Sequence, residues 1–198
     1  MSKVLLPGLI GVEDKLQHST AKSAELIAKA MGSYPYYEVD NKLDKLLKGN
    51  ISYPQYRASF LETAGLSDNY IDIFDHHCLQ MFDSPYVYTE ALLKNVATHC
   101  QLYLLSDHCE VWVEYITNKH SFFEYFTAIV WSYEIAATKK SSAPFTAILE
   151  KYQLDPASCL FVDDNLDNIA NAREMGLQVL YFKNPASVEQ VYAAIGIC

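Results

Sequence analysis

Three features that would place this 198-residue chain in other protein classes are missing from its sequence. No apolar run approaches the roughly 18 residues that a membrane-spanning helix needs, so we expect no membrane partner. Basic residues do not predominate: the net charge is −9, which argues against binding a nucleic-acid backbone through bulk electrostatics. The five cysteines are an odd number without C-x-x-C spacing, so we expect reduced thiols, a cytoplasmic location and no zinc site. Small molecules or proteins are the expected partners.

The composition is that of an ordinary globular protein. Hydrophobic residues make up 51% of the chain and charged residues 20%, which a disordered protein would not show. The length allows one domain, or a core domain that carries a smaller inserted one.

Short apolar runs alternate with helical patterns in the second half of the chain. These runs have the length and composition of strands buried on both faces, and they lie at residues 102–105, 128–131, 159–162 and 178–182. Val4 to Leu6 resemble a first strand that ends at Pro7-Gly8. A capping box of Ser187 and Gln190 predicts the start of the last helix. The alternation predicts an α/β fold, a Rossmann-like parallel sheet with a site at the carboxyl ends of its strands.

Residues 20–95 read mostly as helices that interrupt this pattern. Three apolar faces recur at helical spacing, formed by Leu26, Ile27 and Ala30, by Leu43, Leu46 and Leu47, and by Tyr56, Phe60, Leu61 and Ala64. The helical segment therefore forms an insertion that could cover the site. We expect a core domain of residues 1–13 and 96–198 and a helical cap domain of residues 14–95.

The most informative stretch is CLFVDDNLDNIANAREMG, residues 159–176. It predicts a buried strand that ends in two adjacent carboxylates, Asp163 and Asp164, followed by a helix that stops at Gly176. Two acids at a strand end need a cation opposite them, either a metal ion, usually magnesium, or a lysine.

Two further strand ends carry polar groups. Ser106 follows the run LYLL, and Lys139 lies after the run AIVW and before a helix. A hydroxyl, a cation and paired acids on neighbouring strand ends suit a phosphoryl group, with the hydroxyl and lysine holding its oxygens.

The order and spacing of these motifs resemble the haloacid dehalogenase (HAD) superfamily, mostly phosphatases, with a helical cap inserted after the first motif. LLSDH is similar to the second motif, where Ser106 would bind phosphate. SYEIAATKKSSAPF resembles the third motif, in which the lysine six residues before Phe145 is Lys139. FVDDNLDNIANAREMG resembles the fourth motif, and GNISYPQYRASFLETAGL a pair of cap helices. The resemblance covers nearly the whole chain.

The first motif departs from the family pattern, which is a strand ending in Asp-x-Asp-Gly. The corresponding stretch is KVLLPGLIGV, and aligning Gly11 with the motif's glycine places Gly8 at the nucleophile and Ile10 at the acid/base. Neither side chain supports these roles. The resemblance therefore implies a catalytically impaired relative that keeps the phosphate-binding residues Ser106 and Lys139.

The loss of two acids also bears on the metal. Asp163 and Asp164 remain as metal ligands, and because Mg²⁺ is held by one or two carboxylates plus water and substrate oxygens, weak magnesium binding is expected. The alternative is that Lys139 lies over the acids and neutralises them directly, which we favour.

Three functions stay open at this point. The first is binding of a small phosphorylated molecule, another anion or a protein without hydrolysis. The second is an active hydrolase that uses Asp14, or His108 with a metal-bound water. The third is an interaction protein with a vestigial pocket, for which the tyrosine cluster of Tyr34, Tyr36 and Tyr37 is a candidate surface.

Overall fold

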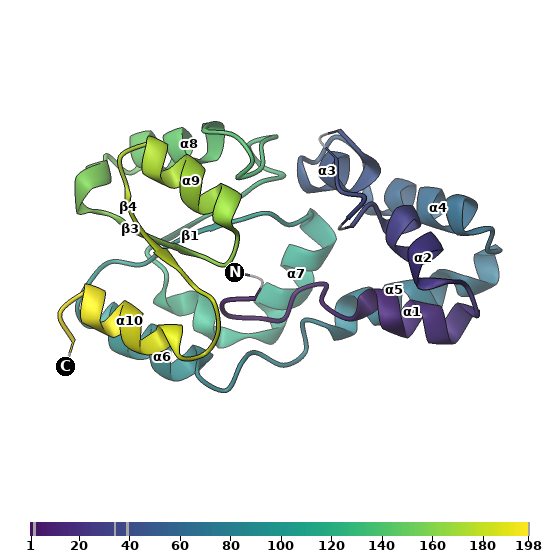
Figure 1. The fold of residues 1–198 in the computed structure, drawn as a ribbon, viewed down its shortest axis with the longest axis horizontal. Coiled ribbons are helices and arrows are strands. Elements are labelled where there is room, and N and C mark those ends of the chain that lie inside the picture. The colour runs from purple at the N-terminus through teal and green to yellow at the C-terminus, as the bar shows by residue number, and fades with distance from the viewer. Residues whose placement is uncertain (2, 34, 39, 198) are drawn as a thin grey trace.

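The chain folds as a long series of helices followed by alternating strands and helices (Figure 1). The computed structural model describes residues 1, 3–33, 35–38 and 40–197. The helices before the first strand are α1 (Val12–Thr20), α2 (Ala24–Met31), α3 (Lys42–Leu47), α4 (Tyr53–Ala64), η1 (Asp68–Tyr70), α5 (Ile71–Gln80) and α6 (Thr89–Ala97). The remaining elements are β1 (Tyr103–Ser106), α7 (Glu110–Lys119), η2 (Ser121–Tyr125), β2 (Ala128–Trp131), α8 (Ala143–Lys151), η3 (Pro156–Ser158), β3 (Leu160–Asp163), α9 (Leu166–Glu174), β4 (Gln178–Tyr181) and α10 (Ser187–Ala194).

The strands form two parallel pairs. β1 pairs with β2, with Ser106 opposite Trp131, and β3 pairs with β4, with Asp163 opposite Tyr181. These are the four apolar runs of the second half of the sequence, so the predicted α/β class with parallel strands is confirmed.

Both faces of these strands are covered by helices. Leu105 and Val130 pack with apolar residues of α8 and α9, whereas Leu104 and Trp131 pack in a larger core that includes residues of α6, α7 and α10. In Figure 1, α8 and α9 lie on one side of the strands and α6 and α10 on the other. Burial on both faces explains why these strands read as continuous apolar runs.

Helices α1 to α5 form a separate group beside the strands, on the right in Figure 1. The predicted faces are buried here: Ile27 in α2, Leu46 in α3 and Phe60 in α4 are each at most 1% exposed. α4 begins with a capping box of Ser52 and Gln55, which satisfies its first backbone donors. We call α1 to α5 the helical lobe. The division at residues 14–95 stays a prediction, and α6 lies with the strands, where Asn95 donates to the hydroxyl of Tyr192 in α10 (3.3 Å).

The expected first strand at Val4 to Leu6 is wrong, because within it only Leu6 makes an isolated β-bridge. Residues 3–5 form turns, with Lys3 at a φ of 60° and its backbone N–H donating to the carbonyl of Leu6 (2.6 Å). Pro7 has no N–H to offer a neighbouring strand, and Gly8 has a φ of 68°, which is not an extended conformation. The strands of the described residues therefore form two separate two-stranded sheets instead of one continuous sheet.

The predicted capping box of the last helix is also wrong. The cap of α10 is Ala186, and no side chain caps its first turn. The hydroxyl of Ser187 instead accepts the backbone N–H of Lys183 (3.0 Å), so it stabilises the preceding turn.

Two further sequence expectations concern the whole chain. Among the described residues, no helix has both the length and the apolar character required to cross a membrane. The four cysteines in the described part of the chain, Cys78, Cys100, Cys109 and Cys159, are free thiols.

The first residue of α6 anchors the N-terminal turns, which gives a test of this part of the fold. The hydroxyl of Thr89 is buried and donates to the carbonyl of Leu5 (2.7 Å). Thr89→Val should lower the free energy of unfolding by about 1 kcal/mol, because it removes one buried hydrogen bond. Urea denaturation measures the change. The exposed Thr98, which donates to the carbonyl of Asn95, is the control, and Thr98→Val should change stability by less than about 0.5 kcal/mol. Equal effects of both changes would contradict the anchoring role.

Candidate functional site

The polar residues that the sequence singles out lie at the carboxyl ends of the strands. Ser106 is the last residue of β1, and Asp163 is the last residue of β3. Lys139 comes from the loop that joins β2 to α8. All three are buried, with exposed fractions of 2% for Ser106, 5% for Lys139 and 3% for Asp163. β1 and β3 belong to separate strand pairs, so the link between their ends is Lys139, which contacts Asp163 at the end of β3 and Asp107, the residue after Ser106.

A buried ion pair joins two of these residues. Nζ of Lys139 donates to Oδ2 of Asp163 at 2.7 Å. Burial by itself would raise the pKa of Asp163, but the ammonium group of Lys139 more than offsets it, and the pKa of this carboxyl is lowered. The pKa of Lys139 is raised despite its burial, through the charges of Asp163 and Asp107. Both groups are therefore charged at neutral pH, and the sequence-based preference for a lysine over the acids corresponds to this contact.

The second oxygen of Asp163 is occupied as well. Oδ1 accepts the backbone N–H of Asn165 (2.9 Å) and the side-chain amide of Asn168 (3.0 Å). Asn165 also caps α9, because its side chain accepts the N–H groups of Asp167 and Asn168. The start of α9 therefore holds the carboxylate of Asp163 in a fixed orientation, with partners on both oxygens.

Two residues that we did not single out from the sequence hold the backbone of Lys139. Its N–H donates to the carboxylate of Asp107, 3.2 and 3.4 Å from the two oxygens, and its carbonyl accepts the side-chain amide of Asn171 (2.8 Å). Asp107 directly follows Ser106, and Asn168 and Asn171 are spaced by three on one face of α9. Those two signals, an acid at a strand end and an Asn-x-x-Asn spacing, were available in the sequence.

The site carries more negative than positive side chains. The pKa of Asp107 is raised, chiefly by burial and against the opposing charge of Lys139. The pKa of Asp164 is also raised by burial, and further by the charge of its neighbour Asp163. Nζ of Lys3 lies 3.9 Å from Oδ2 of Asp164, a partly exposed pair that offsets little of this charge. Lys139 is the buried cation that these carboxylates share.

The remaining candidate residues are Gly8 and Ile10 of the first-motif stretch, Asp14 and His108. Gly8 is buried, and Ile10 is 45% exposed. Asp14 is exposed in the first turn of α1. His108 is 3% exposed against the rings of Phe82, Trp112 and Trp131, and burial lowers its pKa to about 3, so its imidazole is neutral.

Solved structures with a similar fold include three enzymes or predicted enzymes. A HAD family enzyme from Bacteroides thetaiotaomicron is 21% identical, with a TM-score of 0.75 over 97% of this chain and 95% of that one. A predicted HAD-like family hydrolase from Porphyromonas gingivalis is 16% identical, with a TM-score of 0.68 over 88% and 91%. L-2-haloacid dehalogenase from Xanthobacter autotrophicus, with chloropropionic acid covalently bound, is 16% identical, with a TM-score of 0.66 over 99% and 81%. At these identities the likeness establishes the fold.

Sequence comparison establishes the family. A search of curated proteins gives no match. The family model of the haloacid dehalogenase-like hydrolases, however, matches residues 10–176, which is most of the chain and includes the ends of β1 and β3 with Lys139 between them. The chain therefore belongs to the haloacid dehalogenase-like hydrolase family.

Proposed function

We propose that this protein binds a phosphate ester or a similar anion and, unlike an active hydrolase of its family, does not hydrolyse it. The observation that carries the proposal is the pair Gly8 and Ile10, which stand where the family motif has its two aspartates. Covalent phosphoryl transfer needs a nucleophile in line with the leaving oxygen, and neither residue supplies one. Within this proposal the protein acts in the cytoplasm, in keeping with the free thiols of the described cysteines.

The proposed ligand site uses Ser106 and Lys139 as donors to the phosphate oxygens. A related structure of the Bacteroides enzyme, 21% identical, is a complex with magnesium and inorganic phosphate, which supports this ligand class. Three carboxylates surround Lys139 here, however, and their charges oppose the entry of a dianion. Phosphate alone should therefore bind weakly unless a cation accompanies it.

The resident groups do not form a magnesium site as they stand. Both oxygens of Asp163 are engaged by Lys139 and by groups of α9. Within the part of the chain that the structure describes, no group of three or more His, Cys, Asp or Glu side chains is placed to share a metal ion. Asp164 is the carboxylate with the least occupied oxygens. The fit to a tightly held magnesium ion is poor, and we propose that magnesium binds weakly and mainly together with phosphate.

Turnover is the first test of this proposal. The purified protein with magnesium should show no phosphatase activity above background over a panel of phosphate esters, because loss of the nucleophile in another hydrolase costs about a millionfold in turnover. Gly8→Asp combined with Ile10→Asp should not restore activity, because Gly8 lies in a turn with a φ of 68° and would not present a carboxylate from the end of a strand. Activity of the unmodified protein that Asp164→Asn abolishes would overturn the proposal in favour of a metal-dependent hydrolase.

Calorimetric titration tests the ligand. Magnesium and inorganic phosphate should each bind weakly alone, and each should increase the affinity for the other by the same factor, as thermodynamic linkage requires. Ser106→Ala should weaken this joint binding, and the control Ser121→Ala, at the start of η2 and away from the strand ends, should not. Tight magnesium binding to the protein alone, or no phosphate binding under any condition, would contradict the proposal.

The buried ion pair gives a stability test. Lys139→Met should lower the free energy of unfolding at neutral pH by about 3 to 5 kcal/mol, because Asp163 is left buried without its cation. Lys139→Met combined with Asp163→Asn should cost less than the single change. Lys119→Met, which breaks the more exposed pair with Asp83, should cost much less than Lys139→Met, because solvent screens an exposed ion pair. Urea denaturation of the four proteins measures these differences.

The same pair predicts the pH dependence of stability. The pKa of Asp163 is lowered, so its contribution is present above the ordinary carboxyl pKa and is lost as pH falls through the lowered value. The pKa of Lys139 is raised, so its contribution is present below the ordinary lysine pKa and is lost as pH rises through the raised value. The cost of Lys139→Met should therefore shrink in acid. A cost that stays constant down to about pH 2 would contradict the charged pair.

Interaction with a protein is the second candidate, and one observation favours it. Ser106, Lys139 and Asp163 are all nearly inaccessible, as in a vestigial pocket. The tyrosine cluster offers less support: the hydroxyl of Tyr37 donates to Asp44 (2.5 Å), that of Tyr36 donates to Glu25 (3.2 Å), and Tyr34 lies outside the described residues. Absence of phosphate binding in the titration would favour this candidate.

A further inference from the structure

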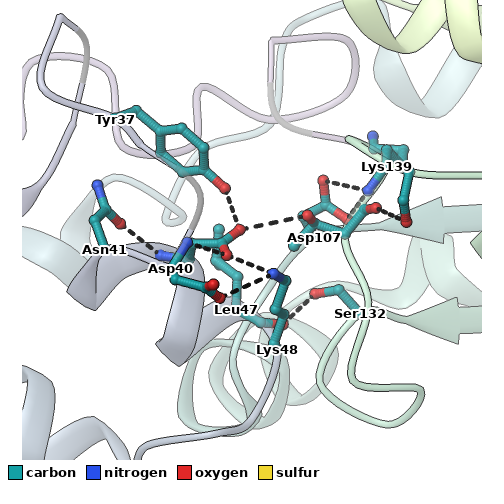
Figure 2. A network of polar contacts seen from close by, with 11 residues as sticks. Tyr37, Asp40, Asn41, Leu47, Lys48, Asp107, Ser132 and Lys139 are labelled. Atoms are coloured by element: carbon teal, nitrogen blue, oxygen red, sulfur yellow. Dashed lines mark hydrogen bonds and ion pairs between the residues drawn. The ribbon is translucent and has the colours of Figure 1, made fainter.

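A second polar network joins the helical lobe to the loop that carries Lys139 (Figure 2). On one side lie Tyr37 and the segment 40–49, which contains α3. On the other side lie residues 132–140, which include Lys139. We call this contact the junction. The two segments are about 90 positions apart in sequence, as for the pair Asp44 and Thr138 (94 positions).

Asp44 is the centre of the junction. It is fully buried (0% exposed), and Nζ of Lys48, one turn later in the chain, lies 2.6 Å from its Oδ2. The same carboxylate accepts the hydroxyl of Tyr37 (2.5 Å) and the backbone N–H of Asp40 (2.9 Å). Burial acts to raise the pKa of Asp44, but these partners, Lys48 first, lower it overall, so the group is ionised at neutral pH.

Four contacts join the helical lobe to residues 132–140. The hydroxyl of Thr138 donates to Asp44 at 3.5 Å, a long hydrogen bond, and the hydroxyl of Ser132 donates to the carbonyl of Leu47 at 2.6 Å. Nζ of Lys140 lies 4.3 Å from the ring centre of Tyr37. The fourth is steric, because a side chain on Gly49 would meet the carbonyl of Tyr133 at 2.9 Å.

These contacts lie on both sides of Lys139 in the chain. Ser132 and Tyr133 precede it in the chain, and Thr138 and Lys140 are its two neighbours in sequence. Lys139 itself is in a loop, where no strand or helix ladder fixes its backbone. The junction therefore restrains the loop that places the ammonium group on Asp163.

We propose that Asp44 is a positioning residue for Lys139: it holds the helical lobe against residues 132–140 and so helps to fix the loop that places the lysine on Asp163. The role of Lys139 in anion binding rests on the proposed function above, whereas the mechanical coupling does not. Because Asp44 touches neither Lys139 nor a ligand, it acts through the loop.

Hydrogen exchange measured by mass spectrometry tests the coupling without any ligand. Asp44→Asn keeps the size of the side chain and removes the ion pair with Lys48. Exchange of peptides that cover residues 132–140 should rise about tenfold, the factor expected for loss of one charge-assisted hydrogen bond, and exchange in α8 should not change. The matched control is Asp75→Asn, which breaks the ion pair with Arg57 inside the helical lobe and should leave residues 132–140 unchanged.

Two results would overturn the coupling. One is unchanged exchange of residues 132–140 in Asp44→Asn, and the other is equal loosening of these residues by Asp75→Asn. If Asp44→Asn does not fold, Ser132→Ala and Tyr37→Phe replace it, since each removes a single hydroxyl group of the junction and should raise the same exchange.

Titration with inorganic phosphate in the presence of magnesium then separates the two proposals. Phosphate affinity should fall in Asp44→Asn and stay unchanged in Asp75→Asn. An unchanged affinity in Asp44→Asn would overturn the positioning role while leaving the proposed function intact. If the unmodified protein binds no phosphate but the exchange result holds, the proposed function fails and the coupling of the lobe to the loop stands.

Discussion

The organisation of the site depends on one buried cation. Lys139 contacts Asp163 directly, and its charge also acts on Asp107 and Asp164, so carboxylates at the ends of β1 and β3 share its ammonium group. A buried carboxylate without a cation is costly, and water is excluded here. Every element around the site accordingly serves to keep Lys139 in place: Asp107 fixes its N–H, Asn171 fixes its carbonyl, and Asn168 orients the carboxylate that it binds.

The changes at the N-terminus are consistent with this reliance on a lysine. Gly8 and Ile10 stand at the positions that we align with the two aspartates of the family's first motif, and the backbone of this stretch is not extended at Lys3 and Gly8, which both have positive φ. Each aspartate removed lowers the negative charge that a divalent ion would balance. The acids that remain are neutralised in part by Lys139 and, at the surface, by Lys3. Under the proposed function, gain of activity by substitution has to overcome two obstacles, the missing carboxylates and a backbone that does not present them from a strand.

Local sequence patterns predicted most of the fold and half of the site. The strands at residues 103–106 and 160–163 were found because burial on both faces leaves a continuous apolar run, and Lys139 because of its spacing from Phe145. The predictions failed where the same local sequence pattern is compatible with two different local structures. Val4 to Leu6 are as apolar as a strand, but Val4 and Leu5 lie in turns and Leu6 makes only an isolated bridge, and the hydroxyl of Ser187 accepts the N–H of Lys183 instead of capping a helix. Asp44 could not be identified from local patterns, because its contact with the loop that carries Lys139 is made to Thr138, 94 positions away in sequence.

The position of Lys139 in a loop explains why the helical lobe matters for the site. A residue in a strand or helix is held by regular backbone hydrogen bonds, but a loop residue needs anchors from elsewhere. α9 and the end of β1 supply the anchors on one side, and the junction around Asp44 supplies those on the other. Among the described residues, Asp44 makes no hydrogen bond with the carboxylates at the strand ends, so its effect on Lys139 passes through the backbone of residues 132–140, which it reaches at Thr138.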